Sequence, residues 1–592
     1  MSGLGLVLSI AKDALAAQQY GMDVTAHNIA NVNTPGYSKQ TPVYEAKQPA
    51  PYGGGVVIGR GVDIKEVLRN SDQFIENQLM RQRSSMSSSK EMEGYIQVLE
   101  GLFSESTGTS ISAMLSDFWN LWHDIANNPS GASERIALFE HSLFLSQQFK
   151  NLEANLQGVE TDLTNAIKAS VSEVNQITNE IAQLNNRFAW MGSGTIANDL
   201  ADKRSTLVSK LSEVIDVKTF EQSNGSLTVV TARGCILVQG NASYDLQMGG
   251  SDGKNVEWQG SSGTIIDVTN HISNGKLGSC LEARDEVIAK YKLELDAVAR
   301  EFIWAVNQQH SQGVGQEAFG SVTGTYSFSS TGEAVGAANS GLNFYDKIVD
   351  GSFKVWLYDQ NGDLVVEGGT TIDIDADVTP IYDTDPLTSD IATKIDEIDA
   401  DITASITDGK LQISASNGYT FAFSGDTSNV LAALGINTLL SGASASSISV
   451  NDKISADKNF IAAAKVNSNG TFASGDNTNA LAIADLRYTL TDIPQWTCDR
   501  IQGNVEGSVT ATIEDYYHSM VGSLGMMSAS VSRMREFNEV MVNRLEQIRD
   551  GISAVSLDEE MTNLVKFQHA YTAAAKLISV SDQMLEVLLN TK

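Results

Sequence analysis

Residues 145–184 read LSQQFKNLEANLQGVETDLTNAIKASVSEVNQITNEIAQL, a stretch with a long helical repeat. Its apolar residues, from Leu145 through Leu163 to Leu184, recur at spacings of three and four for roughly five heptads. Asn, Gln, Glu and Lys occupy the positions between them. Such a repeat is typical of rod-like helical packing and not of a compact enzyme core. It predicts one very long helix that begins near Ser133.

Working outward, the helical pattern covers most of residues 71–215, and Ser71-Asp72 is a plausible N-cap. Residues 216–275 are rich in Gly, Ser, Thr and Val, which predicts a β domain. A helix returns over residues 276–310, and a second β-rich region follows over residues 313–455. Within that region we expect exposed antiparallel strands at Ser352–Tyr358 and Lys410–Ser414, and one short helix from Ser389 to Ile402.

Both chain ends are predicted to be amphipathic helices. The first should end near Asn31–Gly36, where Asn, Pro and Gly occur together, and the last should cover Asp558–Asn590. The N-terminal stripe consists of Leu4, Leu8, Ala11, Leu15, Met22 and Ile29. The C-terminal stripe consists of Met561, Leu564, Tyr571, Ala575, Ile578, Leu585 and Leu589. Lone helices at chain ends fray, so we expect both stripes to pack against neighbouring subunits.

A length of 592 residues suggests roughly four compact units. We predict an α+β multidomain fold with coiled-coil-like paired terminal helices, a long helical rod, and β-rich domains inserted in the middle of the chain. The expected divisions are 1–70 with 556–592 for the terminal helical domain, 71–215 with 276–312 and 456–555 for the rod, 216–275 for one β-rich domain, and 313–455 for an additional, outward one.

Composition excludes several classes of partner and of protein. There are 40 Lys and Arg against 72 Asp and Glu, a formal charge of −32, which would repel nucleic acid and anionic membranes. No apolar run is long enough to span a bilayer, and no cleavable signal is visible, so conventional signals would place the chain in the cytoplasm. The three cysteines, Cys235, Cys280 and Cys498, are far apart in sequence and are expected to be buried thiols, not disulfides or zinc ligands.

We find no pattern that predicts a catalytic, cofactor or metal site. The seven histidines form no HExxH motif or pair at metal-ligand spacing, and the chain has no GxSxG motif. The best metal candidate is Asp373, Asp375 and Asp377, which would project from one face of a strand. They lack the turn glycine and terminal Glu of a calcium loop, so we interpret them as a solvated face or as protection of a strand edge.

The two ends carry the most distinctive motifs. Residues 27–40 read HNIANVNTPGYSKQ, and residues 555–576 read VSLDEEMTNLVKFQHAYTAAAK. Both resemble the terminal signatures of the rod and hook axial proteins of the bacterial flagellum. The positions that carry the resemblance are Asn28, Ala30, Asn31, Thr34, Gly36, Tyr37, Leu557, Asp558, Glu559, Glu560, Gln568 and Tyr571. The long helical region is similar to the hook-associated junction proteins of that superfamily, whereas hook and rod proteins are mostly β between their ends.

The resemblance implies a structural protein with no enzymatic activity that joins hook to filament through its terminal helices. It implies as partners the hook protein, the second hook-associated junction protein, and copies of the chain in a ring. An export chaperone would bind the C-terminal region. The resemblance also implies an extracellular location in the flagellum, reached by the flagellum-specific type III route without a cleaved signal peptide. The alternatives are a hook or distal-rod protein, an enzyme hosted in residues 313–455, or a surface-binding module in that region.

Overall fold

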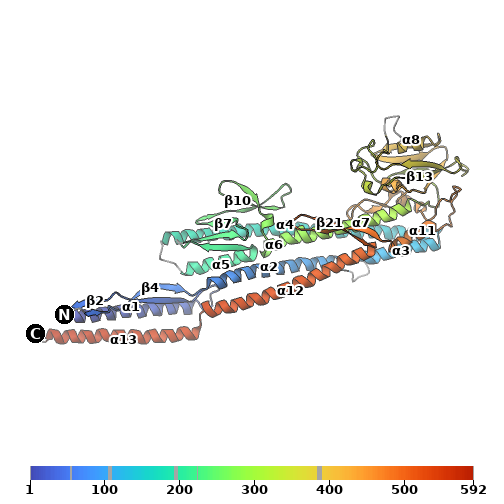
Figure 1. Ribbon diagram of the computed structural model, residues 1–592. Coiled ribbons are helices and arrows are strands. Elements are labelled where there is room, and N and C mark those ends of the chain that lie inside the picture. The colour runs from blue at the N-terminus through green and yellow to red at the C-terminus, as the bar shows by residue number, and fades with distance from the viewer. Residues whose placement is uncertain are drawn as a thin grey trace. The chain divides into compact units, whose positions relative to one another are not determined.

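The computed structural model describes residues 2–53, 56–104, 110–191, 198–222, 225–382 and 390–590. The chain forms two compact units, and Figure 1 labels their helices and strands. The first unit consists of Met1–Gly94, Leu163–Glu282 and Ser530–Lys592. The second consists of Tyr95–Asp162 and Ala283–Ala529. Helices and strands share the chain, so the predicted α+β class is confirmed.

The terminal helices pair within the first unit. Helix α1 (Ser2–Ala30) and helix α13 (Leu557–Asn590) lie alongside each other, with both chain ends at the same end of the pair (Figure 1). Gly21 lies at their crossing, where an added Cβ would be 2.9 Å from Cε1 of Phe567 and 2.6 Å from Oη of Tyr44. A larger residue would force the helices apart, so this glycine permits the close approach.

Two small antiparallel ribbons follow α1. Strand β1 (Gln40–Ala46) pairs with β4 (Val62–Arg69), and β2 (Ala50–Gly53) pairs with β3 (Val56–Ile58). Two contacts hold β1 and Lys47, the residue that follows it, against α1. Oη of Tyr44 donates to the Ala17 carbonyl at 3.2 Å, and Nζ of Lys47 is 2.8 Å from Oδ2 of Asp13.

The predicted long helices are present. They are α2 (Gln73–Leu102), α3 (Ile111–Asn127), α4 (Ala132–Met191), α5 (Asn198–Val214), α12 (Ile513–Ser553) and, after residue 275, α6 (Gly275–Glu282), a π-helical turn (Ala283–Ile288) and α7 (Ala289–His310). Oδ1 of Asp72 caps α2 by accepting from the backbone N–H of Phe74 at 2.8 Å, as expected. In α4, the apolar positions of the repeat are buried except for Val159, which is half-buried.

Two sheets form the predicted β domain of the first unit. One has the order β5-β6-β7-β8, with bounds Val217–Glu221, Leu227–Thr231, Ile236–Gln239 and Ala242–Ser243. The other has the order β11-β10-β9, with bounds Ile265–Asp267, Asn255–Gln259 and Leu246–Gly249. Asn185 and Asn175 of α4 fasten one sheet each. Asn185 exchanges hydrogen bonds with the N–H and C=O of Leu227, and Asn175 does the same with Leu246. Polar residues of the helical repeat thus hold the β domain.

An aromatic cluster forms part of the core of the second unit. Phe118 and Trp119 of α3 meet Phe302 of α7 with ring centroids 5.1 and 5.8 Å apart. Helix α11 (Thr478–Ala484) packs on α3. A hairpin of β20 (Thr491–Thr497) and β21 (Val505–Ala511) lies on α7. This hairpin is an addition to the helices expected in residues 456–555.

The β-rich region of the second unit contains two three-stranded sheets and a short pair. Strand β13 (Gly351–Tyr358) lies between β14 (Thr370–Ile374) and β17 (Thr420–Ser424). Strand β16 (Lys410–Ala415) lies between β12 (Ser321–Thr323) and β15 (Ile402–Thr407). The pair is β18 (Leu440–Ser441) with β19 (Ser449–Val450). Short helices are α8 (Ile391–Asp396), α9 (Val430–Leu434) and α10 (Asp452–Ala456), with 3-10 turns at Thr269–His271 in the first unit and at Ala338–Ser340, Tyr345–Lys347, Lys458–Phe460 and Asp485–Tyr488 in the second.

Three local predictions in this region are wrong. Strand β13 is buried and not exposed, because segments pack over its faces: Trp356 and Tyr358 lie in a core cluster with Val314, Ala464 and Val466. The Asp373 strand ends at Ile374, so Asp375 and Asp377 lie in a turn, where the N–H of Asp377 donates to Oδ1 of Asp375 at 3.2 Å. The predicted helix at Ser389–Ile402 is only Ile391–Asp396, and Ser389 lies outside the described residues.

Cys280 and Cys498 are buried, as predicted, whereas Cys235 is only half-buried. Among the described residues, no helix combines the length and apolar character needed to cross a membrane. In the same part of the chain, no three His, Cys, Asp or Glu side chains lie close enough together to hold a metal ion.

Candidate assembly site

Asn28 is the centre of the site formed by the two terminal motifs. Its buried amide Nδ2 donates to the Gln40 carbonyl at 2.9 Å and to Oε2 of Glu560 at 3.0 Å. Its Oδ1 accepts from Oη of Tyr37 at 2.7 Å and from the N–H of Gln40 at 3.0 Å. Every hydrogen-bonding position of the amide is therefore used. One side chain fixes both the loop after α1 and the first turn of α13.

Glu560 is a buried carboxylate at the start of α13. Nζ of Lys39 lies 3.4 Å from Oε1 of Glu560 and 2.8 Å from Oε2 of Glu559. Burial alone would lower the pKa of Lys39, but its hydrogen bond to Glu559 and the two carboxylate charges raise that pKa above its usual value. The N-terminal end of α13 further favours these acids, as expected from the helix dipole. Asp558 and Leu557 are exposed.

The loop after α1 is held in a specific shape. Nδ2 of Asn31 donates to the His27 carbonyl at 3.0 Å, and Oγ1 of Thr34 donates to Oδ1 of Asn31 at 3.1 Å. Gly36 has φ of +80°, and an added Cβ would be 2.5 Å from Oγ1 of Thr206 on α5. Only glycine suits both the left-handed backbone and the tight contact. Ala30 is exposed.

Helix α5 supplies residues that the sequence alone did not identify. Asp202 accepts from the Ser38 N–H at 3.0 Å and from Nε of Arg69 at 2.6 Å. Asp199 accepts from Nε2 of Gln40 at 2.9 Å. The motif lies more than 150 positions earlier, and no local pattern marks these acids. Burial, followed by the charges of Asp199, Asp202 and Glu560, raises the pKa of Tyr37, so its hydroxyl stays a neutral donor to Asn28.

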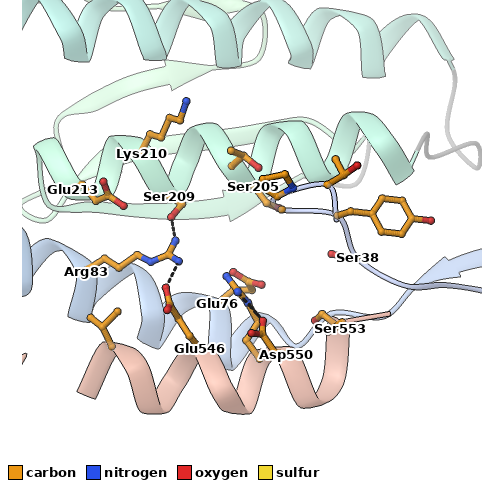
Figure 2. A pocket seen from close by; sticks show the side chains of 18 of the residues that line it. Ser38, Glu76, Arg83, Ser205, Ser209, Lys210, Glu213, Glu546, Asp550 and Ser553 are labelled. Carbon is orange, nitrogen blue, oxygen red and sulfur yellow. Dashed lines mark hydrogen bonds and ion pairs between the residues drawn. The ribbon is translucent and has the colours of Figure 1, made fainter. Parts of the chain in front are cut away.

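A cavity of about 730 Å³ lies behind the loop (Figure 2). The loop, α2, α5 and the end of α12 line it. Arg83 bridges its walls by donating to Oγ of Ser209 and to Oε1 of Glu546, the latter at 2.5 Å (Figure 2). The lining residues include Arg and Lys as well as Asp and Glu, but no His or Cys. Basic and acidic side chains are equal in number in this lining, so the wall is close to charge-balanced.

The structure places the predicted stripes unevenly. In α1, Ala11 is fully buried, and Leu4, Leu8, Leu15, Met22 and Ile29 are half-buried. In α13, Leu564, Ile578 and Leu585 are half-buried, whereas Met561, Tyr571, Ala575 and Leu589 are exposed, as is Gln568 of the motif. The most buried positions of α13 are instead Glu560, Ala574 and Ser581. Because the buried positions of α13 carry polar or small residues, a search for apolar periodicity does not detect them.

A further apolar stripe of α13 remains exposed. It consists of Leu577, Val580, Met584 and Val587, which recur at spacings of three and four. Three of them line a groove of about 450 Å³ together with Leu4 and Gln583. The groove is therefore a largely apolar surface between the two chain ends.

Comparisons with known proteins match both motifs and the long helices. One family model, the helical domain of the flagellar hook-associated protein FlgK, matches residues 96–325. Two others, the flagella basal body rod protein and the C-terminal part of the flagellar basal body rod FlgEFG protein, match residues 8–37 and 551–591. Together the three models match just over half of the chain.

Full-length relatives agree with these matches. The flagellar hook-associated protein 1 of Bacillus subtilis is 26% identical over 100% of this chain and 99% of its own length. Those of Salmonella typhimurium and Escherichia coli are 27% and 26% identical over 99% of this chain and 100% of their own lengths. A solved structure, the flagellar hook junction protein FlgK from Burkholderia pseudomallei, is 17% identical, with a TM-score of 0.48 over 81% of this chain and 100% of that chain. From the family models and the full-length relatives, the chain belongs to the flagellar hook-associated protein 1 family, and it is a structural part of the flagellum and not an enzyme.

Proposed function

We propose that copies of this chain form a ring that joins hook to filament, and that they pack on one another through the outward apolar faces of the α1–α13 pair. The exposed stripe of Leu577, Val580, Met584 and Val587 carries this proposal. Exposed apolar side chains in a row are disfavoured in water, and burying them against a neighbour removes that cost. Head-to-tail contacts between identical subunits generate rings or open helical arrays, so they suit a thin ring of roughly one helical turn of subunits.

The proposed neighbours are the hook protein on one side and the second hook-associated junction protein on the other. The names of the relatives support contact with hook components. Before assembly, an export chaperone covers the C-terminal region, and the chain leaves the cell by the flagellar type III route without a cleaved signal peptide. The apolar α13 stripe is the surface that most needs cover during this stage.

The proposal assigns a separate role to each part of the chain. Residues 1–70 and 556–592 assemble, residues 71–215, 276–312 and 456–555 form the rod, and residues 216–275 and 313–455 form β-rich domains. The support is the set of hydrogen bonds that Asn28 makes to Tyr37, Gln40 and Glu560, because these bonds join the two termini into one structural element. Limited proteolysis of the purified chain should first cut near the proposed boundaries.

Immunogold electron microscopy of intact flagella, with antibody against the full chain, tests the location. We expect one narrow band between hook and filament. Label along the whole hook or the rod would instead support a hook or distal-rod protein, and absence of flagellar label would contradict the proposal. A Val580→Asp, Met584→Asp variant should lose the band, whereas Gln583→Asp, which adds a charge beside the stripe, should weaken it less.

A further inference from the structure

Helix α12 presents polar groups toward α2 over the part that belongs to the first unit, residues 530–553. Asn538 is buried there, with Oδ1 accepting from Gln82 at 2.7 Å and Nδ2 donating to Oγ of Ser89 at 3.0 Å. Two ion pairs with α2 flank it, one about one turn before Asn538 and the other about two turns after it. Arg535 is 2.8 Å from Glu93, and Glu546 is 2.5 Å from Arg83.

The opposite face of the same helix segment is apolar and exposed. Its members are Met534, Phe537, Val540, Met541, Ile548 and Ile552, with exposed fractions between 36% and 65%. At 100° per residue these six positions fall within an arc of about 120°, which is one face of the helix. We call this set the α12 stripe.

An ordinary surface helix turns mainly polar and charged residues to water. This segment instead exposes apolar residues on its outer face, while its inner face combines Asn538 and the two ion pairs with the buried Val542. The exposed apolar area of the α12 stripe is on the order of 500 Å², similar to the largest patch on a typical monomer. Each partner in a stable protein interface contributes roughly 800 Å², so the stripe could supply most of one side.

We propose that the α12 stripe is an interface with a second copy of this chain. Arg533 and Arg544 are exposed and fall within the same arc of the helix, so this face also presents two cations. The chain has 72 acidic and 40 basic residues. A second copy therefore offers more carboxylates that can pair with these two cations than basic groups that would repel them. The inference rests on the proposed self-assembly, to which it adds a contact distinct from the α13 stripe.

Site-specific photo-crosslinking in assembled flagella tests this contact. The full-length chain carries benzoylphenylalanine at position 537, in the α12 stripe, or at position 584, in the α13 stripe. Position 536 is the control, because Glu536 is exposed on α12 outside the stripe. We expect position 537 to give a product of two copies of this chain, identified by mass spectrometry, at about ten times the yield of position 536.

The two proposals fail in different ways. A homotypic product at position 584 and none at 537 overturns the α12 interface and leaves the proposed function standing. A product at 537 that contains only another protein also overturns it, as does equal yield at 536 and 537. No product at any position in flagella that contain the chain would contradict the proposed self-assembly itself.

A substitution experiment checks the same contact without a crosslinker. Phe537→Glu with Val540→Glu should lower the amount of chain per flagellum about ten-fold. Glu is a better helix former than Phe or Val, so the purified variant should keep the wild-type unfolding temperature. Gln547→Glu is the matched control, because it adds a charge at an exposed position of the same helix outside the stripe. Wild-type incorporation of the double variant would overturn the inference.

Discussion

Asn28 near the end of the first helix donates a 3.0 Å hydrogen bond to Glu560 in the first turn of the last helix, across 532 positions of sequence. Both side chains are buried. A buried amide and a buried carboxylate are stable only when paired, so each requires the other to be in place. The two terminal motifs thus form one structural element, although they lie at opposite ends of the chain.

Asn28→Ala should therefore loosen this element. The change removes the hydrogen bonds to Tyr37, Gln40 and Glu560 and leaves a buried carboxylate with fewer donors. We expect the first unit to lose about 2–4 kcal/mol of unfolding free energy. Denaturant unfolding followed by circular dichroism would measure it. Asn33→Ala, at an exposed position of the same loop, is the control and should change stability by less than about 0.5 kcal/mol.

Gly36→Ala should destabilise the loop for two separable reasons. The left-handed backbone costs any residue with a Cβ about 1 kcal/mol, and the added Cβ meets Oγ1 of Thr206. The combined variant Gly36→Ala, Thr206→Ala should recover the part due to the clash but not the backbone part. Gly59→Ala is the control, because nothing lies within 4 Å of a Cβ there. Equal unfolding midpoints for Gly36→Ala and Gly59→Ala would contradict the account.

His310 should make the second unit less stable in acid. It is fully buried, its Nδ1 donates to the Asn437 carbonyl at 2.8 Å, and its Nε2 accepts from the Ala462 N–H at 3.0 Å. Burial, with a smaller contribution from the charge of Arg135, lowers its pKa from 6.5 to about 4. The unfolded chain binds this proton at higher pH than the folded chain does. Stability is therefore complete above pH 6.5 and falls by about 3 kcal/mol as pH drops toward 4.

Glu294 should have the opposite effect. Burial raises its pKa from 4.5 to about 7, with Nζ of Lys290 3.8 Å away as a partial offset. The folded chain keeps this proton between pH 4.5 and 7, whereas the unfolded chain has lost it. Stability is thus complete below pH 4.5 and falls by about 3 kcal/mol as pH rises toward 7. The contributions of His310 and Glu294 oppose each other between pH 4.5 and 6.5.

Glu294→Gln should reveal the pH dependence of stability due to His310, which Glu294 offsets in the wild type. Unfolding free energies measured from pH 4 to 7 should rise more steeply with pH in this variant than in the wild type, because the opposing contribution of Glu294 is removed while that of His310 remains. The variant His310→Gln should show the opposite change in slope. A variant profile parallel to that of the wild type, in either case, would show that the residue does not titrate as its environment implies.

The helices could be predicted from sequence because their apolar repeat continues over many more residues than a chance pattern would. The face that α13 turns toward α1 could not, because it carries Glu560 and Ser581 while Leu577 and Val580 are exposed. Where a helix has one apolar face for its own chain and another for a neighbour, periodicity does not distinguish the two. The prediction for strand β13 is wrong for a related reason. Its alternation is typical of a half-exposed strand, yet Trp356 and Tyr358 are covered by Val314, Ala464 and Val466 from distant parts of the chain.

The N-terminal motif around Asn28 could be identified from sequence, but the residues of other elements that hold its loop, such as Asp202 and Arg69, could not. Asp202 and Arg69 lie in different elements and meet only through the fold. A buried ion pair leaves no periodic trace in the sequence, since each member looks like an ordinary surface charge. The same holds for Asn175 and Asn185 of α4, which read as polar spacers in a helical repeat and prove to be the attachment points of the β domain.

Asn185 gives the final prediction. Its amide donates to the carbonyls of Leu227 and Gly240 at 2.7 and 2.8 Å and accepts from the Leu227 N–H at 2.9 Å. Asn185→Ala removes the partner of two buried backbone groups of Leu227 and of the part-buried Gly240 carbonyl. Ala is a good helix former, so any loss is not due to α4 itself. Hydrogen exchange at Leu227 should accelerate at least about ten-fold, which corresponds to about 1.4 kcal/mol of local stability. Asn186→Ala, at the exposed neighbouring position, should leave that exchange rate unchanged. Equal protection of Leu227 in both variants would mean that the sheet packs on α4 without this side chain.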